Sequence, residues 1–565
     1  MIPYLLRIIL TLLCLYSTQK VFTLHPMSLF SVGCVVVSLL LEKRASEASS
    51  KNRTAGAVMG FVFALFTSLA HYGNFLFSSF GASIFYILLF SIGLAPCFSI
   101  LTICLYDTLE KTAVHQNKGT SDKKIFLYSF AFIFLVWCCF FLAYFPGIYS
   151  PDSLWQLQQA MGDSPLSNHH PVIHTLLMKL VLNIGNLLFG GNLIASTALL
   201  SVLQMLFLAL CIGYGIMTSW HIGCSFGLCA ASALFFALVP FNIMFSFTHL
   251  KDSWFAGFFL VFCSLMTKIS SGDSLSKKDL CLFALSVIGS GLFRSNGLYA
   301  LLLLLPFLLA NRKTNKKVVA VFAICLILCF VITVPVYSTL GVTAVDPVEY
   351  LSIPLQQISR VIVDGGKISE SDYALLSQVI YPSLIPSSYY ARISDNIKNL
   401  IRTSGNQQFI ADHKVEFLSL WFRLLMDNPS SYINAYVDQT LGFWYPEQTG
   451  IPFVISTDPN PYGVTSYGIL PAALSNALRA WTYSNNQQSF LGIFFSCGGY
   501  VWLFLLLFAY SLTKKSSAVV FLPSFFLWGT LLLTTPVYGD IRYLYAVVAC
   551  LPLLFSFVLT HRKTD

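Results

Sequence analysis

The sequence predicts an all-α polytopic membrane protein, and three features lead to this fold class. Apolar residues make up 56% of the 565 residues, and the mean hydropathy is +0.72. Charged residues make up only 10%, whereas a soluble domain has about a quarter of its residues charged. The apolar residues gather in runs of about 20, the length that an α-helix needs to cross a bilayer.

We expect about 14 transmembrane helices separated by polar connections. They are predicted at 4–20, 26–42, 55–72, 82–105, 125–145, 192–218, 222–247, 253–269, 280–293, 297–310, 318–338, 489–512, 517–534 and 543–560. The first run resembles a signal peptide, but it lacks a small-residue cleavage site and a second span follows directly. We therefore interpret it as an uncleaved helix.

The basic residues lie in short clusters between the spans, which is typical of cytoplasmic loops. The clusters are at 42–53, 111–124, 268–278, 311–317, 514–515 and 562–563. The net charge of +9 is thus interpreted as an orientation signal, and no nucleic-acid partner is expected. Both termini become cytoplasmic if 171–189 lies flat on the outer surface as an amphipathic helix, with His174, Thr175 and Lys179 on its polar face.

This topology divides the chain into four parts. Residues 1–124 form an N-terminal four-helix region, 125–338 a membrane core with two outer loops, and 489–565 the C-terminal helices. Residues 339–488, called the inserted segment below, form a mostly helical extracytoplasmic segment between spans. Because it contains no cysteine, no disulfide framework is expected there.

Two aspartates on the same predicted membrane face are the leading candidates for catalysis. Asp152 lies in the first outer loop and Asp252 at the start of the 253–269 span. Ionisable residues beside a bilayer are costly to keep, so function is the default interpretation. The structural alternatives are a helix-capping role for Asp152 and a favourable position in the helix dipole for Asp252.

Three cations are predicted on that same face, and their geometry would suit phosphate oxygens. Lys251 precedes Asp252, Arg294 lies between two short helices in FRSNG, and Arg542 opens the last span in YGDIRYLY. The structural alternatives are an ion pair between Arg542 and Asp540, and an Arg294 side chain that reaches lipid headgroups.

The first outer loop also offers groups that would bind a sugar or phosphate through ring stacking and hydrogen bonds. These are Trp155, Gln156, His169, His170 and His174. His170 and His174 are four residues apart, but no Glu lies between them and no cysteine is near, so zinc catalysis is disfavoured. The two aspartates would suit Mg²⁺, Mn²⁺ or Ca²⁺ without requiring any of them.

The order of these residues resembles the GT-C superfamily of integral-membrane glycosyltransferases, especially its protein O-mannosyltransferase and lipid A aminoarabinose transferase branch. The shared features are the loop acid, the HHPVIHTLL turn, an amphipathic helix ending in Phe-Gly-Gly, a second Asp, a basic helix junction and a final Arg-Tyr. They cover roughly 125–338 and 489–560. The resemblance implies inverting transfer from a polyprenyl-phosphate sugar to a cell-envelope acceptor, at the outer face of a bacterial plasma membrane.

The resemblance also implies a role for each charged residue. Asp152 would be the base for the acceptor hydroxyl, and Asp252 would assist it or hold a metal. Lys251, Arg294 and Arg542 would hold the lipid phosphate. The chain departs from the mannosyltransferase pattern in having Asp-Ser instead of Asp-Glu at the first acid, and in its four preceding spans and inserted segment. The sugar and the acceptor are therefore left open.

Two other functions fit parts of the pattern. One is a transporter or flippase of lipid-linked glycans, and the other is a non-catalytic cell-envelope assembly protein. Transporters usually carry charged residues at mid-membrane and are often built from repeated halves. Here the charges gather at one predicted face and no repeat is visible, which favours the enzyme.

Overall fold

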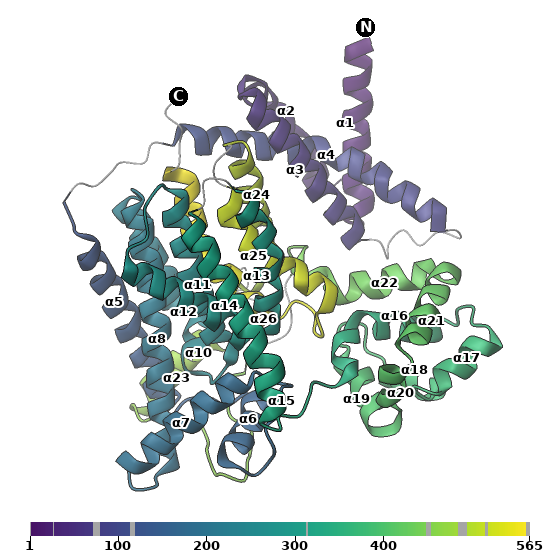
Figure 1. Cartoon of the computed structure of the whole chain (residues 1–565). Coiled ribbons are helices and arrows are strands. Elements are labelled where there is room, and N and C mark those ends of the chain that lie inside the picture. The colour runs from purple at the N-terminus through teal and green to yellow at the C-terminus, as the bar shows by residue number, and fades with distance from the viewer. Residues whose placement is uncertain are drawn as a thin grey trace.

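The computed structural model describes residues 2–25, 28–71, 80–112, 119–311, 315–447, 454–483, 494–514 and 518–560. Within these ranges the regular structure is helical, and the β contacts are isolated bridges between loops rather than strands (Figure 1). The expected all-α class is therefore confirmed.

Seven described helices are long and apolar enough to cross a membrane, or eight if one bent pair counts as a span. They are α3 (Ser50–Ala70), α4 (Phe80–Lys111), α5 (Asp122–Ala143), α8 (Leu193–His221), α11 (Lys251–Ser270), the stretch Lys316–Thr339 and α26 (Ile541–Thr560). The bent pair, α9 (Phe226–Leu238) and α10 (Pro240–Phe247), turns by 61° where Pro240 begins a new helix. These helices indicate a multi-pass membrane protein, while the total of about 14 spans stays a prediction.

The other predicted spans are helical in stretches that are shorter or less apolar. They are α1 (Ile2–Val21), α2 (Leu29–Glu47), α12 (Lys277–Phe293), α13 (Ser295–Ala310), α24 (Cys497–Leu512) and α25 (Ala518–Thr534). Lys316–Thr339 consists of α14 (Lys316–Val331), a π-helical turn (Ile332–Val336) and α15 (Tyr337–Thr339).

The basic cluster at 42–53 differs from the loop that the sequence predicts, because α2 and α3 occupy most of it. The break between them is short because Ser49 caps α3 by accepting a hydrogen bond from the backbone N of Asn52. Of the other basic clusters, 113–118, 312–314, Lys515, Arg562 and Lys563 lie outside the described residues.

The first loop of the core contains α6 (Pro151–Met161) and the expected amphipathic helix α7 (Val172–Leu188). Leu176, Leu180 and Leu187 are exposed on α7. His174 and Thr175 are buried, although the pattern assigns them to the polar face of the helix. This difference arises because α6 packs on α7 and offers polar partners to both residues.

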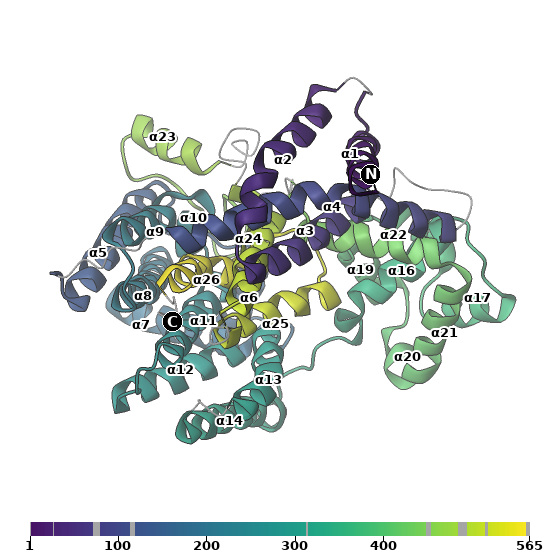
Figure 2. The same ribbon diagram turned by 90° about the horizontal axis from the view of Figure 1, so that it is seen from above.

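The inserted segment is helical, and its residues between Val348 and Tyr432 form an apolar core of their own, which includes Val361, Phe417 and Leu420. Its elements are the 3₁₀ turn Pro347–Leu351, α16 (Ser352–Val363), α17 (Glu370–Ser377), the 3₁₀ turn Pro382–Leu384, α18 (Ile385–Ser388), α19 (Asp395–Ser404), α20 (Gln407–Asp412), α21 (Lys414–Asp427), α22 (Pro429–Thr440), the 3₁₀ turn Leu441–Phe443 and α23 (Ala472–Thr482). Helices α16–α22 lie together on one side of the membrane core, whereas α23 packs across the end of α5 (Figure 2).

Helices α11 and α26 pack against each other in the middle of the membrane core. Both are largely buried along their length, and both begin at the end of the core where α6 lies. The first turns of these two helices carry Lys251, Asp252 and Arg542. Helix packing therefore brings residues that are almost 300 positions apart in the sequence to one place.

The close approach of α3 and α4 gives a test of the N-terminal packing. A Cβ atom on Gly60 would lie 2.3 Å from the backbone N of Ser99, so Gly60→Ala should destabilise the protein by about 1–3 kcal/mol through overpacking. Gly529→Ala in α25 is the matched control, because no described atom lies within 4 Å of the added methyl group there. Thermal unfolding of the purified proteins in detergent measures the difference. Equal midpoints for the two variants would contradict the close contact.

Candidate functional site

Two short backbone contacts join loops that are distant in the sequence. Ile148 forms a parallel bridge with Thr248, and its backbone N donates to Phe247 O at 3.2 Å. Ser167 forms a second parallel bridge, with Thr343. The first contact places α6 beside the start of α11. The second places the loop between α6 and α7 (residues 162–171, called the histidine-containing loop below) beside the inserted segment.

Asp152 does not serve as the cap of α6. Ser150 has that role, because its side chain accepts a hydrogen bond from Ser153 N at 3.2 Å. The Asp152 carboxylate instead accepts a hydrogen bond from Arg542 Nη1 at 2.8 Å, and its Oδ2 lies 3.7 Å from Lys251 Nζ. The capping interpretation is therefore wrong, and the carboxylate belongs to an ion-pair network.

The two charged residues that begin α11 have different partners. Lys251 Nζ donates to His170 Nδ1 at 2.7 Å and lies on a cavity wall. Asp252 is only 2% exposed, and its Oδ1 forms an ion pair with Arg294 Nε at 3.0 Å. Asp252 thus lies behind the wall, where it holds the guanidinium of Arg294 in position.

The start of α26 carries the third cation together with its own carboxylate. Arg542 N donates to Asp540 Oδ1 at 2.9 Å, and Arg542 Nε lies 3.4 Å from Asp540 Oδ2. The ring of Tyr543 lies 4.8 Å from Arg294 Cζ and 4.9 Å from Arg542 Cζ, so it contacts both guanidinium groups. Arg542 therefore forms an ion pair with its neighbour Asp540 and, at the same time, binds Asp152 of the first outer loop.

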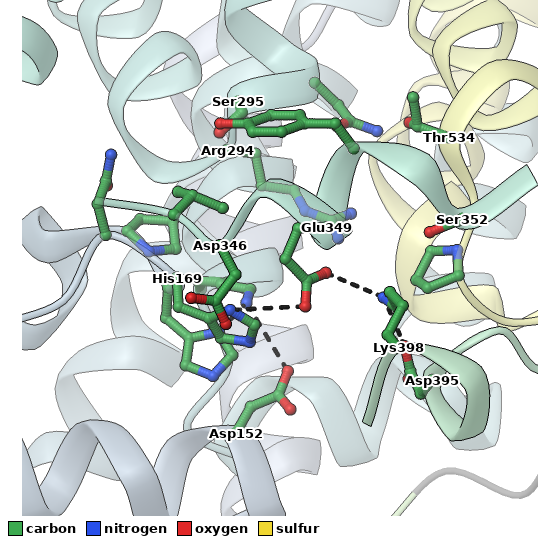
Figure 3. A pocket seen from close by; sticks show the side chains of 18 of the residues that line it. Asp152, His169, Arg294, Ser295, Asp346, Glu349, Ser352, Asp395, Lys398 and Thr534 are labelled. Carbon is green, nitrogen blue, oxygen red and sulfur yellow. Dashed lines mark hydrogen bonds and ion pairs between the residues drawn. The ribbon is translucent and has the colours of Figure 1, made fainter. Parts of the chain in front are cut away.

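These groups surround a cavity of about 460 Å³ (Figure 3). Its wall contains residues from the first outer loop, from the starts of α11, α13 and α26, and from the inserted segment. The predicted site residues on the wall are Asp152, Trp155, His169, His170, Lys251, Arg294 and Arg542. Gln156 and His174 are not on the wall. His174 Nδ1 donates to Gln156 Oε1 at 2.9 Å, and this buried contact fixes α6 against α7.

The opposite wall comes from the inserted segment, and sequence reasoning selected none of its residues. Glu349 accepts hydrogen bonds from Lys398 (2.9 Å) and Arg402, and its Oε1 lies 3.7 Å from His169 Nδ1. Asp346 pairs with Arg402 at 2.9 Å and Asp395 with Lys398 at 2.6 Å, so three carboxylates and two cations line this wall (Figure 3). The spacing of Asp395, Lys398 and Arg402 on one face of α19 is the sequence signal that could have revealed it.

The electrostatics of the cavity fix the charge states of its main groups. Burial raises the pKa of the Asp152 carboxyl, but the charges of Arg542 and Lys251 outweigh this effect and hold the pKa well below its usual range. Burial also acts to raise the pKa of the Glu349 carboxyl, but the charge and hydrogen bond of Lys398 outweigh burial, and the net effect is a lowered pKa. Burial and the charge of Lys251 lower the pKa of His170 to about 2. Both acids are therefore ionised at neutral pH, and His170 is neutral.

Among the described residues, no group of three or more His, Cys, Asp and Glu side chains is arranged to hold a metal ion. Asp152 and Asp252 each face arginine, so they form no shared set of oxygen ligands. The divalent cation considered from the sequence therefore has no assigned ligands.

The helices and the cavity define a class: a helical, multi-pass membrane protein with a charged cavity at the ends of its apolar helices. The chain belongs to a family described as a family of unknown function (DUF6020), whose model matches residues 159–565. The match includes Lys251, Asp252, Arg294 and Arg542, and it begins seven residues after Asp152. Comparisons with curated proteins and with solved structures give no match.

The buried pair of Asp252 and Arg294 generates a stability prediction. Arg294→Leu should destabilise the protein by about 3–5 kcal/mol, because it leaves a buried carboxylate without its charge partner. The double variant Asp252→Leu/Arg294→Leu should recover much of this loss, since it removes both charges. Thermal unfolding in detergent compares the two variants. Additive losses would show that the two side chains do not depend on each other.

Proposed function

We propose that this protein moves a sugar from a polyprenyl-phosphate donor to a cell-envelope acceptor, with inversion, at the outer face of a bacterial plasma membrane. The main support is one accessible carboxylate, Asp152, that lies among Lys251, Arg294 and Arg542 on the wall of a single cavity. Sugar transfer from a phosphate donor needs a base for the attacking hydroxyl and fixed positive charge for the leaving group. The order of these residues along the chain, which resembles the GT-C superfamily, adds to this support.

The proposed reaction has one covalent step. The acceptor oxygen forms a bond to the anomeric carbon, and the bond between that carbon and the phosphate oxygen breaks. The leaving phosphate keeps the electron pair, and the proton of the acceptor hydroxyl passes to an Asp152 oxygen. Arg542 and Lys251 stabilise the negative charge that develops on the phosphate. Arg294, which packs on the ring of Tyr543, contributes a third positive charge.

The surface of α13 supports a lipid-linked donor. Ser295, Asn296 and Tyr299 line the cavity at the start of this helix. Leu302, Leu303 and Phe307 continue the same helix face and are exposed. An apolar path therefore runs from the cavity along a predicted membrane helix, and a prenyl chain would follow it while its phosphate stays in the polar cavity.

The acceptor is assigned to the side of the cavity that the inserted segment forms. Asp346, Glu349 and Asp395 offer carboxylate oxygens that would accept hydrogen bonds from sugar hydroxyls. Trp155 is exposed on the facing wall beside His169, with ring centroids 5.3 Å apart, and offers an aromatic surface for a sugar ring. A hydroxyl-rich, uncharged acceptor fits these groups better than a polyanion, because the three carboxylates outnumber Lys398 and Arg402, the two cations that pair with them.

Replacing the base tests the proposal directly. Asp152→Asn should lower sugar transfer by about 100-fold or more, because an amide cannot take the hydroxyl proton. Asp364→Asn is the matched control. The Asp364 carboxylate lies in the inserted segment, accepts from Arg360 Nε at 2.8 Å and is 32% exposed, against 33% for Asp152. Radiolabelled polyprenyl-phosphate sugars, mixed with the purified variants and a membrane extract, measure transfer.

Full activity in Asp152→Asn would remove the proposed base. Movement of the labelled lipid across vesicles that hold the wild-type protein, with no new glycosidic bond, would indicate the transporter instead. If the wild-type protein neither transfers nor moves the sugar, an assembly role becomes the better interpretation.

A further inference from the structure

Each cation assigned to the donor phosphate already has a carboxylate partner. Arg294 pairs with Asp252 at 3.0 Å, and Arg542 pairs with Asp152 at 2.8 Å and with Asp540 at 3.4 Å. Lys251 lies 3.7 Å from the same Asp152 oxygen that Arg542 contacts. Three positive charges are thus matched by three negative ones. A phosphate that entered this cluster without displacing a carboxylate would add unbalanced negative charge to a largely buried place.

The three carboxylates differ in how easily they can leave their partners. Asp252 is 2% exposed and is enclosed at the start of α11, and Asp540 is held by the backbone N of Arg542. Asp152 is 33% exposed, and its described partners are two flexible side chains. It also lines a second cavity of about 180 Å³, together with Arg542 and Asp540, so it borders more than one open space into which its side chain can turn. Asp152 is therefore the carboxylate that an incoming anion can displace at the lowest cost.

We infer that Asp152 occupies the phosphate site in the resting protein, and that the donor phosphate replaces it on Arg542 and Lys251. The hydrogen bond from Arg542 Nη1 then ends on a phosphate oxygen instead of Asp152 Oδ2, and no proton is transferred in this exchange. This inference rests on the proposed function, and it adds an order of binding: the donor binds first, and the acceptor is deprotonated afterwards.

The exchange would also change the strength of the base. In the resting protein the neighbouring cations hold the pKa of Asp152 low, and a carboxylate in that state is a poor proton acceptor. Once a phosphate neutralises the same cations, the carboxylate is left beside a new negative charge, and both effects make it more basic. The base is thus weak until the donor is in place, so the empty site does not activate a hydroxyl or a water molecule.

Binding of the phosphate lipid, measured apart from transfer, tests this inference. The full-length wild-type protein, Asp152→Asn and Asp364→Asn would be placed in nanodiscs of phosphatidylcholine, with a polyprenyl monophosphate as the probe and the phosphate-free polyprenol as its control. Asp152→Asn should bind the monophosphate about three- to tenfold more tightly than the wild type, because the competing carboxylate is gone. Asp364→Asn should bind it as the wild type does, and no variant should change the affinity for polyprenol.

The outcomes separate the inference from the proposed function. Equal or weaker binding by Asp152→Asn would overturn the inference, since a carboxylate that only supports the fold would weaken binding when it is removed. Wild-type protein that binds the monophosphate no better than polyprenol would overturn the proposed donor class as well. If the asparagine variant does not fold, Asp152→Ser removes the same charge and carries the same expectation. Tighter binding together with lost transfer in one variant is the combination that a purely structural residue cannot produce.

Discussion

The balance of charge at the ends of the apolar helices is the constraint on which the rest of this structure depends. Asp252 and Arg294 are both largely buried, and neither would be stable there alone, because an unpaired charge in a low-dielectric environment is very costly. Their pairing ties the first turn of α11 to the junction of α12 and α13. The pairs that Arg542 forms with Asp152 and Asp540 tie α26 to α6 in the same way. The ion pairs therefore set the relative positions of these five helices as well as the charge of the cavity.

The inserted segment completes the cavity, and its attachment explains how it does so. Backbone hydrogen bonds of 2.9 Å run from Ser394 N to Pro536 O and from Tyr538 N to Arg392 O. The segment thus contacts the loop that leads into Asp540 and Arg542. The bridge between Ser167 and Thr343 holds it to the histidine-containing loop on the other side. A segment with its own apolar core is in this way fixed to both walls of the site.

Local signals in the sequence predicted that the chain is helical, and they selected the residues on one wall of the cavity. Apolar runs mark where membrane helices lie, and the Arg294 break was recognisable because a charged residue interrupts such a run. The positions of the basic clusters predicted that the loops with Asp152, Lys251, Arg294 and Arg542 lie on one membrane face, and the fold brings residues of all four loops to one cavity. The roles assigned to Asp152 and to the cations stay predictions, because geometry places these residues without showing their chemistry.

The parts that sequence reasoning missed depend on contacts between distant elements. No local pattern distinguishes Glu349 from the other acidic residues of the inserted segment, because its partners Lys398 and His169 are distant in the sequence. His174 carries a polar side chain on an amphipathic helix, and only the packing of α6 shows that it is buried. Tyr543 follows Arg542 in the chain, but its contact with Arg294 requires the fold. Side chains whose partners are far away in sequence leave no periodic pattern to read.

The exposed apolar face of α13 has a consequence for how this protein meets its ligands. The residues that continue from the cavity, Leu302, Leu303 and Phe307, face outward from a predicted membrane helix. A molecule that arrives along this face diffuses in two dimensions within one leaflet, so its supply is governed by its mole fraction among the surrounding lipids rather than by its molarity. Dilution of the vesicle suspension would leave occupancy unchanged, whereas dilution with additional phospholipid would empty the site.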